Sequence, residues 1–235
     1  LAGVRRADIR ERVRDSFVSR MRIRQTVVIT DADIALYGTT KGEAGVVVIA
    51  GTGSVCLGID GTGNRAMSGG WGPIAGDEGG GRGIAGEALH SVAKASDGRG
   101  PETKLSERAA EYFRASSVEN LIGAIYAPQM DNSRIAGFAK LVVETAEEGD
   151  VVARRILENA GDELGLAACA VMERLDLTTQ DVPIGCVGSV FDGGRILTEP
   201  MMARILKCTS RAYLTTPKIS PALAAALMAA RSATQ

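Results

Sequence analysis

A carboxylate, a glycine turn and a lone tryptophan are the features of this 235-residue sequence that could do chemistry. Asp31 follows the apolar segment VVIT, where a rigid strand would hold its carboxylate in a partly desolvated position. A carboxylate placed there can accept the proton of a substrate hydroxyl as that hydroxyl attacks an electrophile. Aspartate is also a common N-cap, and taken alone the position favours a cap for a helix beginning at Ala32. Asp33, inside that helix, is expected to point elsewhere.

The second feature is the turn Gly51-Thr52-Gly53-Ser54 between two apolar segments. Its exposed backbone N–H groups and two hydroxyls suit a phosphate oxygen. The tetrapeptide alone nevertheless favours an ordinary hairpin turn. The sequence has no P-loop pattern, and no G-x-G-x-x-G that opens a helix after a strand with an acid about 20 residues further on.

The third feature is the only tryptophan, Trp71, which stands between Gly70 and Gly72 and precedes Asp77 and its neighbour Glu78. Glycines let a ligand approach the backbone, and a carboxylate can accept two hydroxyl donors, so the stretch suits a polyol pocket. The alternative is a glycine-rich connection whose tryptophan fills the core and whose acids favour the N-terminus of the next helix.

The patterning of the chain predicts a mixed α/β fold to position these residues. A hairpin is expected from Gly45–Ala50 and Ser54–Ile59, with a turn at Asp60–Asn64. Further strands are expected at Gln25–Thr30, Asp181–Phe191 and, more weakly, Arg211–Leu214. Helices are expected at 8–21, 32–37, 84–95, 102–115, 118–126, 133–148, 150–175, 197–208 and 222–230.

Composition excludes several classes of function. Charged residues make up 23% of the chain and apolar residues 45%, and no apolar run reaches the roughly 18 residues that span a bilayer. The 27 basic and 28 acidic residues nearly balance, which argues against nucleic acid as a partner. Four widely spaced cysteines and one histidine make a zinc site improbable, and His90 is expected to be a partly buried structural residue in its helix. Reduced cysteines and no visible signal peptide predict a cytoplasmic protein.

Read in order, these segments resemble the N-acetylglucosamine kinase and archaeal hexokinase branch of the BadF/BadG/BcrA-type ATPases, in the sugar kinase, Hsp70 and actin superfamily. The resemblance covers nearly the whole chain. It rests on several motifs that occur in the same order as in the family, and together they are more specific than any single motif. They are VVITDADIAL (27–36), GVVVIAGTGS (45–54), GGWGPIAGDEG (69–79), EGDVVARRILENAGDELG (148–165), VGSVF (187–191) and a last helix led by Pro221.

The resemblance implies an actin-like ATPase fold of two lobes, which use ATP and Mg²⁺ to phosphorylate a sugar. It implies that Asp31 is the base facing the 6-hydroxyl of the sugar. The turn would be the second phosphate loop, with Thr52 contacting ATP. The ATP-binding positions would be Gly51, Thr52, Gly53, Ala160, Gly161 and Gly188, and the sugar-binding positions Ser54, Val55, Gly70, Trp71, Gly72 and Asp77.

The sequence departs from the family pattern in two places. The D-x-G-G-T segment that forms the first phosphate loop does not occur, so the N-terminal lobe is expected to be incomplete, and no residue can be assigned to the metal. Residues 1–68 are expected to form the remainder of that lobe and residues 69–235 the C-terminal lobe. The stretch Gly79–Gly83 also lacks the serine and aromatic residues of relatives, which places sugar specificity in question.

These features predict a kinase for N-acetylglucosamine, with glucose or glucosamine as the next choices, acting as a homodimer. An ATPase that activates a partner enzyme is one alternative, although Cys56 lies inside a strand and fits poorly as a ligand to an iron–sulfur cluster. A sugar-sensing module without catalysis is the other.

Overall fold

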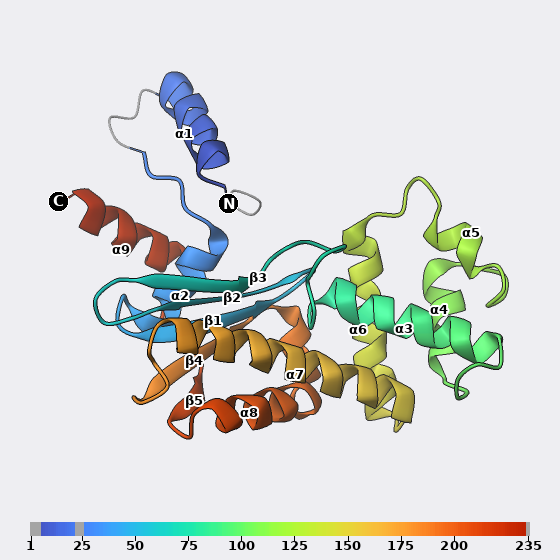
Figure 1. The fold of residues 1–235 in the computed structure, drawn as a ribbon. Coiled ribbons are helices and arrows are strands. Elements are labelled where there is room, and N and C mark those ends of the chain that lie inside the picture. Colours follow the sequence, from blue (N-terminus) through green and yellow to red (C-terminus); the bar gives the residue numbers. More distant parts are fainter. Residues whose placement is uncertain (1–5, 22–25, 234–235) are drawn as a thin grey trace.

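The computed structural model describes residues 6–21 and 26–233, and within them one five-stranded mixed sheet has the order β3-β2-β1-β4-β5 (Figure 1). The central strand β1 pairs antiparallel with β2 and parallel with β4. The strands are β1 Gly45–Ala50, β2 Ser54–Ile59, β3 Arg65–Gly69, β4 Val182–Val187 and β5 Ala212–Thr215.

Helices cover both faces of this sheet, and α7 and α8 lie along one of them (Figure 1). The larger core lies on that side, while a smaller core joins α2 to the opposite face. Because both faces are covered, Val46, Val47 and Val48 are all fully buried, and β1 reads as a continuous apolar run. The helices are α1 Ala7–Met21, α2 Asp31–Thr40, α3 Gly81–Ser96, α4 Leu105–Phe113, α5 Leu121–Ile125, α6 Asn132–Glu147, α7 Val151–Arg174, η1 Ser189–Gly193 (3₁₀), α8 Arg195–Cys208 and α9 Pro221–Ala233.

The predicted hairpin is confirmed with its expected bounds, and Ala50 pairs with Ser54 at its tip. The strand β3 was not predicted, although it pairs with β2 along its length. Its sequence, RAMSG, carries little β propensity, so pairing with a stable neighbour decides its conformation. Strands from both sides of the expected boundary between residues 68 and 69 share this sheet, and the division into lobes stays a prediction.

The strand expected at Gln25–Thr30 is wrong for the part that the structure describes. Residues 26–30 have no regular secondary structure, Val27 is 62% exposed, and Gln25 lies outside the described residues. An apolar β-branched segment becomes a strand only when another strand supplies hydrogen-bond partners, and the described sheet has no strand beside it.

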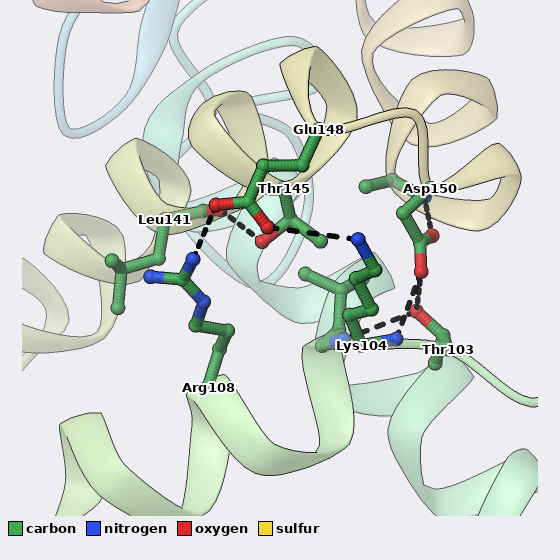
Figure 2. Close-up of polar contacts among 9 residues, drawn as sticks. Thr103, Lys104, Arg108, Leu141, Thr145, Glu148 and Asp150 are labelled. Atoms are coloured by element: carbon green, nitrogen blue, oxygen red, sulfur yellow. Dashed lines mark hydrogen bonds and ion pairs between the residues drawn. The ribbon is translucent and has the colours of Figure 1, made fainter.

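Asp150 is the N-cap of α7, and its carboxylate accepts hydrogen bonds at the starts of both α7 and α4 (Figure 2). One oxygen accepts from the Ala153 N–H at 2.9 Å, and the other accepts from the Lys104 N–H at 2.8 Å and the Thr103 hydroxyl at 3.0 Å. Burial opposes ionisation, but these hydrogen bonds outweigh it and lower the pKa of the Asp150 carboxyl. The contact ties the start of α4 to the start of α7.

The expectation that His90 is partly buried is wrong, because its side chain is exposed on the surface of α3. Its ring lies 3.7 Å from the Glu87 carboxylate, one turn earlier on the same exposed face. The apolar face of α3 is carried instead by Ile84, Ala88 and Val92.

Candidate functional site

The tip of the β1–β2 hairpin has the form of an anion-binding turn. The Gly51 N–H donates to the Gly53 carbonyl at 2.9 Å, which closes the turn and leaves Thr52 exposed. Among the described residues, the N–H groups of Thr52 and Gly53 donate to no acceptor. Two free amides beside a hydroxyl can bind phosphate oxygens.

The N-terminus of α3 meets this turn directly. The Gly81 N–H donates to the Gly51 carbonyl and the Arg82 N–H to the Thr52 carbonyl, both at 2.8 Å. The N-cap is Gly80, which has no side chain to block the approach. A helix of this length carries a partial positive charge at its N-terminus, so its position favours an anion at the hairpin tip.

Asp77 contacts the other side of the turn. It is nearly buried and adopts a left-handed conformation, with φ of 65°. The Ser54 N–H donates to its carboxylate at 3.3 Å, and the Ser54 hydroxyl donates to the Glu78 carbonyl at 2.6 Å. A Cβ at Gly53 would lie about 2.5 Å from the Asp77 carboxylate, so a side chain there would displace that carboxylate.

A cavity of about 490 Å³ opens between the hairpin tip, the start of α3, helix α6 and η1. This volume lies within the usual range for small-molecule sites. Charged groups from α6 and η1 share its wall with the turn. Its polar and backbone lining includes Gly51, Thr52, Ser133, Lys140, Glu144 and Asp192.

Gly188 sets the distance between this hairpin and η1. Its φ is 116°, and a Cβ there would lie 2.2 Å from the Ala50 carbonyl oxygen. Only glycine permits both this conformation and this contact. The next residue, Ser189, therefore lines the cavity.

Ala160 and Gly161 lie elsewhere in the structure. Both are buried in α7, and a Cβ at Gly161 would lie 2.2 Å from the Leu197 carbonyl oxygen of α8. Neither is among the residues that line the cavity. The geometry gives Gly161 a role in helix packing, and its contact with adenosine stays a prediction.

The expected sugar-side residues gather at the edge of the sheet. Trp71 is 69% exposed, which rules out the alternative that it fills the core. Gly70 and Gly72 both have positive φ, and the Gly70 N–H donates to the Ser54 carbonyl at 2.9 Å. A second cavity of about 260 Å³ lies between this edge and α7, and its lining includes Ser54, Val55, Trp71, Glu78 and Glu163.

Asp31 is the first residue of α2, and the N-cap is Thr30, so the expectation that Asp31 itself caps the helix is wrong. Its exposed carboxylate accepts from the Ala32 N–H at 3.1 Å. Asp33, which was expected to point away, completes the capping box and pairs with Arg65 of β3. Asp31 lines neither of the two cavities, and its role as a base stays a prediction.

The α6 side chains in the larger cavity were missed from the sequence. Lys140, Glu144 and Glu147 line the same cavity as Thr52. Their spacing along α6 places them on one face, but nothing in the sequence shows that the face is turned toward the hairpin.

Within residues 6–21 and 26–233, no group of three or more His, Cys, Asp or Glu side chains is arranged to hold a metal ion. Over the same residues, no helix combines the length and apolar character needed to cross a membrane.

Sequence comparison matches residues 1–229 to the BadF/BadG/BcrA/BcrD ATPase family. The chain is 36% identical over 191 residues to the N-acetylmuramic acid/N-acetylglucosamine kinase of Clostridium acetobutylicum, covering 81% of this chain and 62% of that protein. It is 33% identical over 205 residues to the N-acetyl-D-glucosamine kinase of Dictyostelium discoideum, covering 86% and 64%. The chain therefore spans less than two thirds of these relatives.

Two solved structures share the fold. A Chromobacterium violaceum protein described as a candidate N-acetylglucosamine kinase superposes with a TM-score of 0.73 at 24% identity, covering 91% of this chain and 69% of that one. The hexokinase of Schistosoma mansoni, complexed with glucose, superposes with a TM-score of 0.55 at 14% identity, covering 92% and 60%. At these identities the likeness shows the fold alone, which is the actin-like ATPase fold.

Proposed function

Because the chain belongs to the BadF/BadG/BcrA/BcrD ATPase family, we propose that it transfers the terminal phosphoryl group of ATP to the 6-hydroxyl of an amino sugar or hexose. The observation that carries this proposal is the hairpin tip, whose free Thr52 and Gly53 amides lie at the N-terminus of α3 and whose Gly51 and Thr52 line the larger cavity. This arrangement suits a bound phosphate chain better than it suits any neutral ligand.

The cavity fits a nucleotide in both size and chemistry. The turn Gly51–Gly53 would hold phosphate oxygens, while the wall formed by Ser133, Ala136 and Gly137 leaves room for the rest of the nucleotide. Bound ATP with Mg²⁺ supplies the phosphoryl group and neutralises charge that develops during transfer. Gly188 supports the nucleotide side by fixing the hairpin against η1.

The sugar-side proposal rests on Trp71 and its flanking glycines. An exposed indole beside glycines of positive φ offers an apolar face and accessible backbone groups, which together suit a carbohydrate ring. Ser54 and Val55, at the start of β2, line the same cavity as Trp71. Asp31 would accept the proton of the sugar hydroxyl from its place at the start of α2.

N-acetylglucosamine is the first candidate substrate, because both curated relatives are named as kinases of that sugar. Glucose and glucosamine come next. Gly79 and Gly80 connect the Trp71 loop to α3, and Gly81–Gly83 form the first turn of that helix, so a change of sequence there can alter which sugar fits. We place the reaction in the cytoplasm. The homodimer stays a prediction, which a measurement of molar mass by light scattering would test.

The test is ADP release by the purified protein across N-acetylglucosamine, glucose, glucosamine and N-acetylmannosamine. We expect ADP release that depends on sugar, with N-acetylglucosamine giving the highest rate. Release that no sugar stimulates would favour an ATPase that activates another protein. Sugar binding without any ADP release would favour a sensing module.

A further inference from the structure

Asp77 combines three features that a residue facing only a sugar would not need. It is 9% exposed, it has a left-handed backbone, and its carboxylate faces the hairpin tip rather than open solvent. A non-glycine residue in this conformation is uncommon and calls for a reason in the surrounding structure.

The contacts of Gly53 show what the carboxylate does. Gly53 is held between Asp77 on one side and the backbone of Gly80 on the other, since a Cβ added at Gly80 would lie 2.6 Å from the Gly53 carbonyl carbon. The Gly80 N–H donates to the Asp77 carbonyl at 2.9 Å, so the residue that contacts the turn also shapes the start of α3.

Asp77 also divides the amides of the tip into two sets. The Ser54 N–H is taken up by the Asp77 carboxylate at 3.3 Å, whereas the Thr52 and Gly53 amides have no acceptor among the described residues. Among the described residues, the Ser54 N–H is the donor from which this largely buried carboxylate accepts.

We propose that Asp77 is a positioning residue that holds the phosphate-binding hairpin, and that it links the Trp71 loop to that hairpin. In this arrangement the loop that carries Trp71 and the turn that carries Thr52 cannot shift independently. The proposal rests on the proposed function only for the identity of the ligand, because the contact between Asp77 and Ser54 exists without it.

The test compares Asp77→Gly with Asp176→Gly. Asp176 is an exposed aspartate that also has a left-handed backbone, with φ of 54°, so both changes remove a carboxylate and relax the same kind of conformation. Asp77→Asn is the conservative variant, because an amide oxygen can still accept from the Ser54 N–H and asparagine tolerates positive φ.

Hydrogen exchange in a peptide that contains Ser54 is the first measurement, and it needs no activity. We expect at least about tenfold faster exchange in Asp77→Gly, in line with loss of a hydrogen bond to a charged group. We expect near wild-type exchange in Asp77→Asn and in Asp176→Gly. Unchanged exchange at Ser54 in Asp77→Gly would overturn the proposal.

Affinities for a non-hydrolysable ATP analogue and for N-acetylglucosamine are the second measurement. We expect the analogue to bind about tenfold more weakly to Asp77→Gly, whether or not the sugar Kd also rises, because Asp77 is also one of the expected sugar-side residues. Loss of sugar affinity alone would show that Asp77 is a sugar ligand and would also overturn the proposal. If wild-type protein binds no nucleotide, the proposed function fails, and hydrogen exchange still decides whether Asp77 holds the hairpin.

Discussion

Gly188 and Ala50 approach so closely that a Cβ on Gly188 would lie 2.2 Å from the Ala50 carbonyl oxygen. The contact joins the ends of two parallel neighbours, β4 and β1, at the edge where the hairpin tip begins. The spacing between the phosphate turn and η1 therefore depends on the absence of a side chain at one residue.

Gly188→Ala is expected to destabilise the protein by about 3 kcal/mol, because the new methyl group clashes with backbone and the residue must keep φ of 116°. Gly194→Ala is the matched control, since Gly194 also has positive φ but has nothing within 4 Å of its Cβ position. Its expected cost is about 1 kcal/mol. Denaturant unfolding measures both, and equal costs would show that the Ala50 contact is unimportant.

Trp71 provides its own probe, because it is the only tryptophan in the chain and is 69% exposed. Sugar binding should move the indole into a less polar environment and shift its emission to shorter wavelength, whereas ATP alone should leave the emission nearly unchanged. Trp71→Ala should weaken sugar binding at least about tenfold, as expected for an aromatic contact at a binding site, with little loss of stability.

Ile74→Ala is the control for that change, because Ile74 is 99% exposed in the same loop. We expect it to leave both stability and sugar affinity near wild type. An emission shift caused by ATP and not by sugar would place Trp71 on the nucleotide side instead.

Asp31→Asn should lower sugar-dependent turnover at least about a hundredfold, the usual scale for removal of a general base. Sugar affinity should be largely kept, because the amide preserves the shape of the side chain. Asp8→Asn, in the first turn of the exposed helix α1, is the control and should be silent. Wild-type turnover in Asp31→Asn would reject the assignment of the base.

Asp150 should make the free energy of unfolding depend on pH at acidic pH. Its hydrogen bonds lower its pKa in the folded state below the ordinary value of 3.8, so the folded state holds its proton less tightly than the unfolded state does. The resulting stability is present above about pH 4 and is lost as pH falls through the folded pKa. Asp150→Asn should therefore cost about 1 kcal/mol at pH 7 and progressively less below pH 4.

Denaturant midpoints at pH 7, 5, 4 and 3 measure this difference. Glu148→Gln is the control, because Glu148 pairs with Lys104 and Arg108 at the surface and exposed ion pairs contribute little. If Asp150→Asn lowers stability by the same amount at every pH down to 3, the lowered pKa of Asp150 in the folded state is contradicted.

The elements near the hairpin could be predicted because their signals are local. β-branched runs on either side of Gly51-Thr52-Gly53 determine two strands and a turn, whatever surrounds them. The segment at residues 26–30 has similar composition and forms no strand, because strand formation depends on a partner that local sequence does not reveal.

The contacts that shape the candidate site could not be predicted for a related reason. The bond from Ser54 to Asp77 joins two loops, and it requires a left-handed backbone that aspartate rarely adopts. Gly161 has no turn signal, and its use in packing against α8 appears only once the two helices are placed together. Trp71 was a clear signal because its glycine neighbours are unusual around a core residue.

The parallel pairing of Val46 with Ile184 has a consequence for biosynthesis. While the ribosome is still making the helices, β1 and β2 can form a hairpin, but the central strand has one edge uncovered until β4 emerges. Exposed strand edges recruit other chains, so nascent protein should be most prone to aggregate during this interval, and chaperones that shield β-structure should improve its yield.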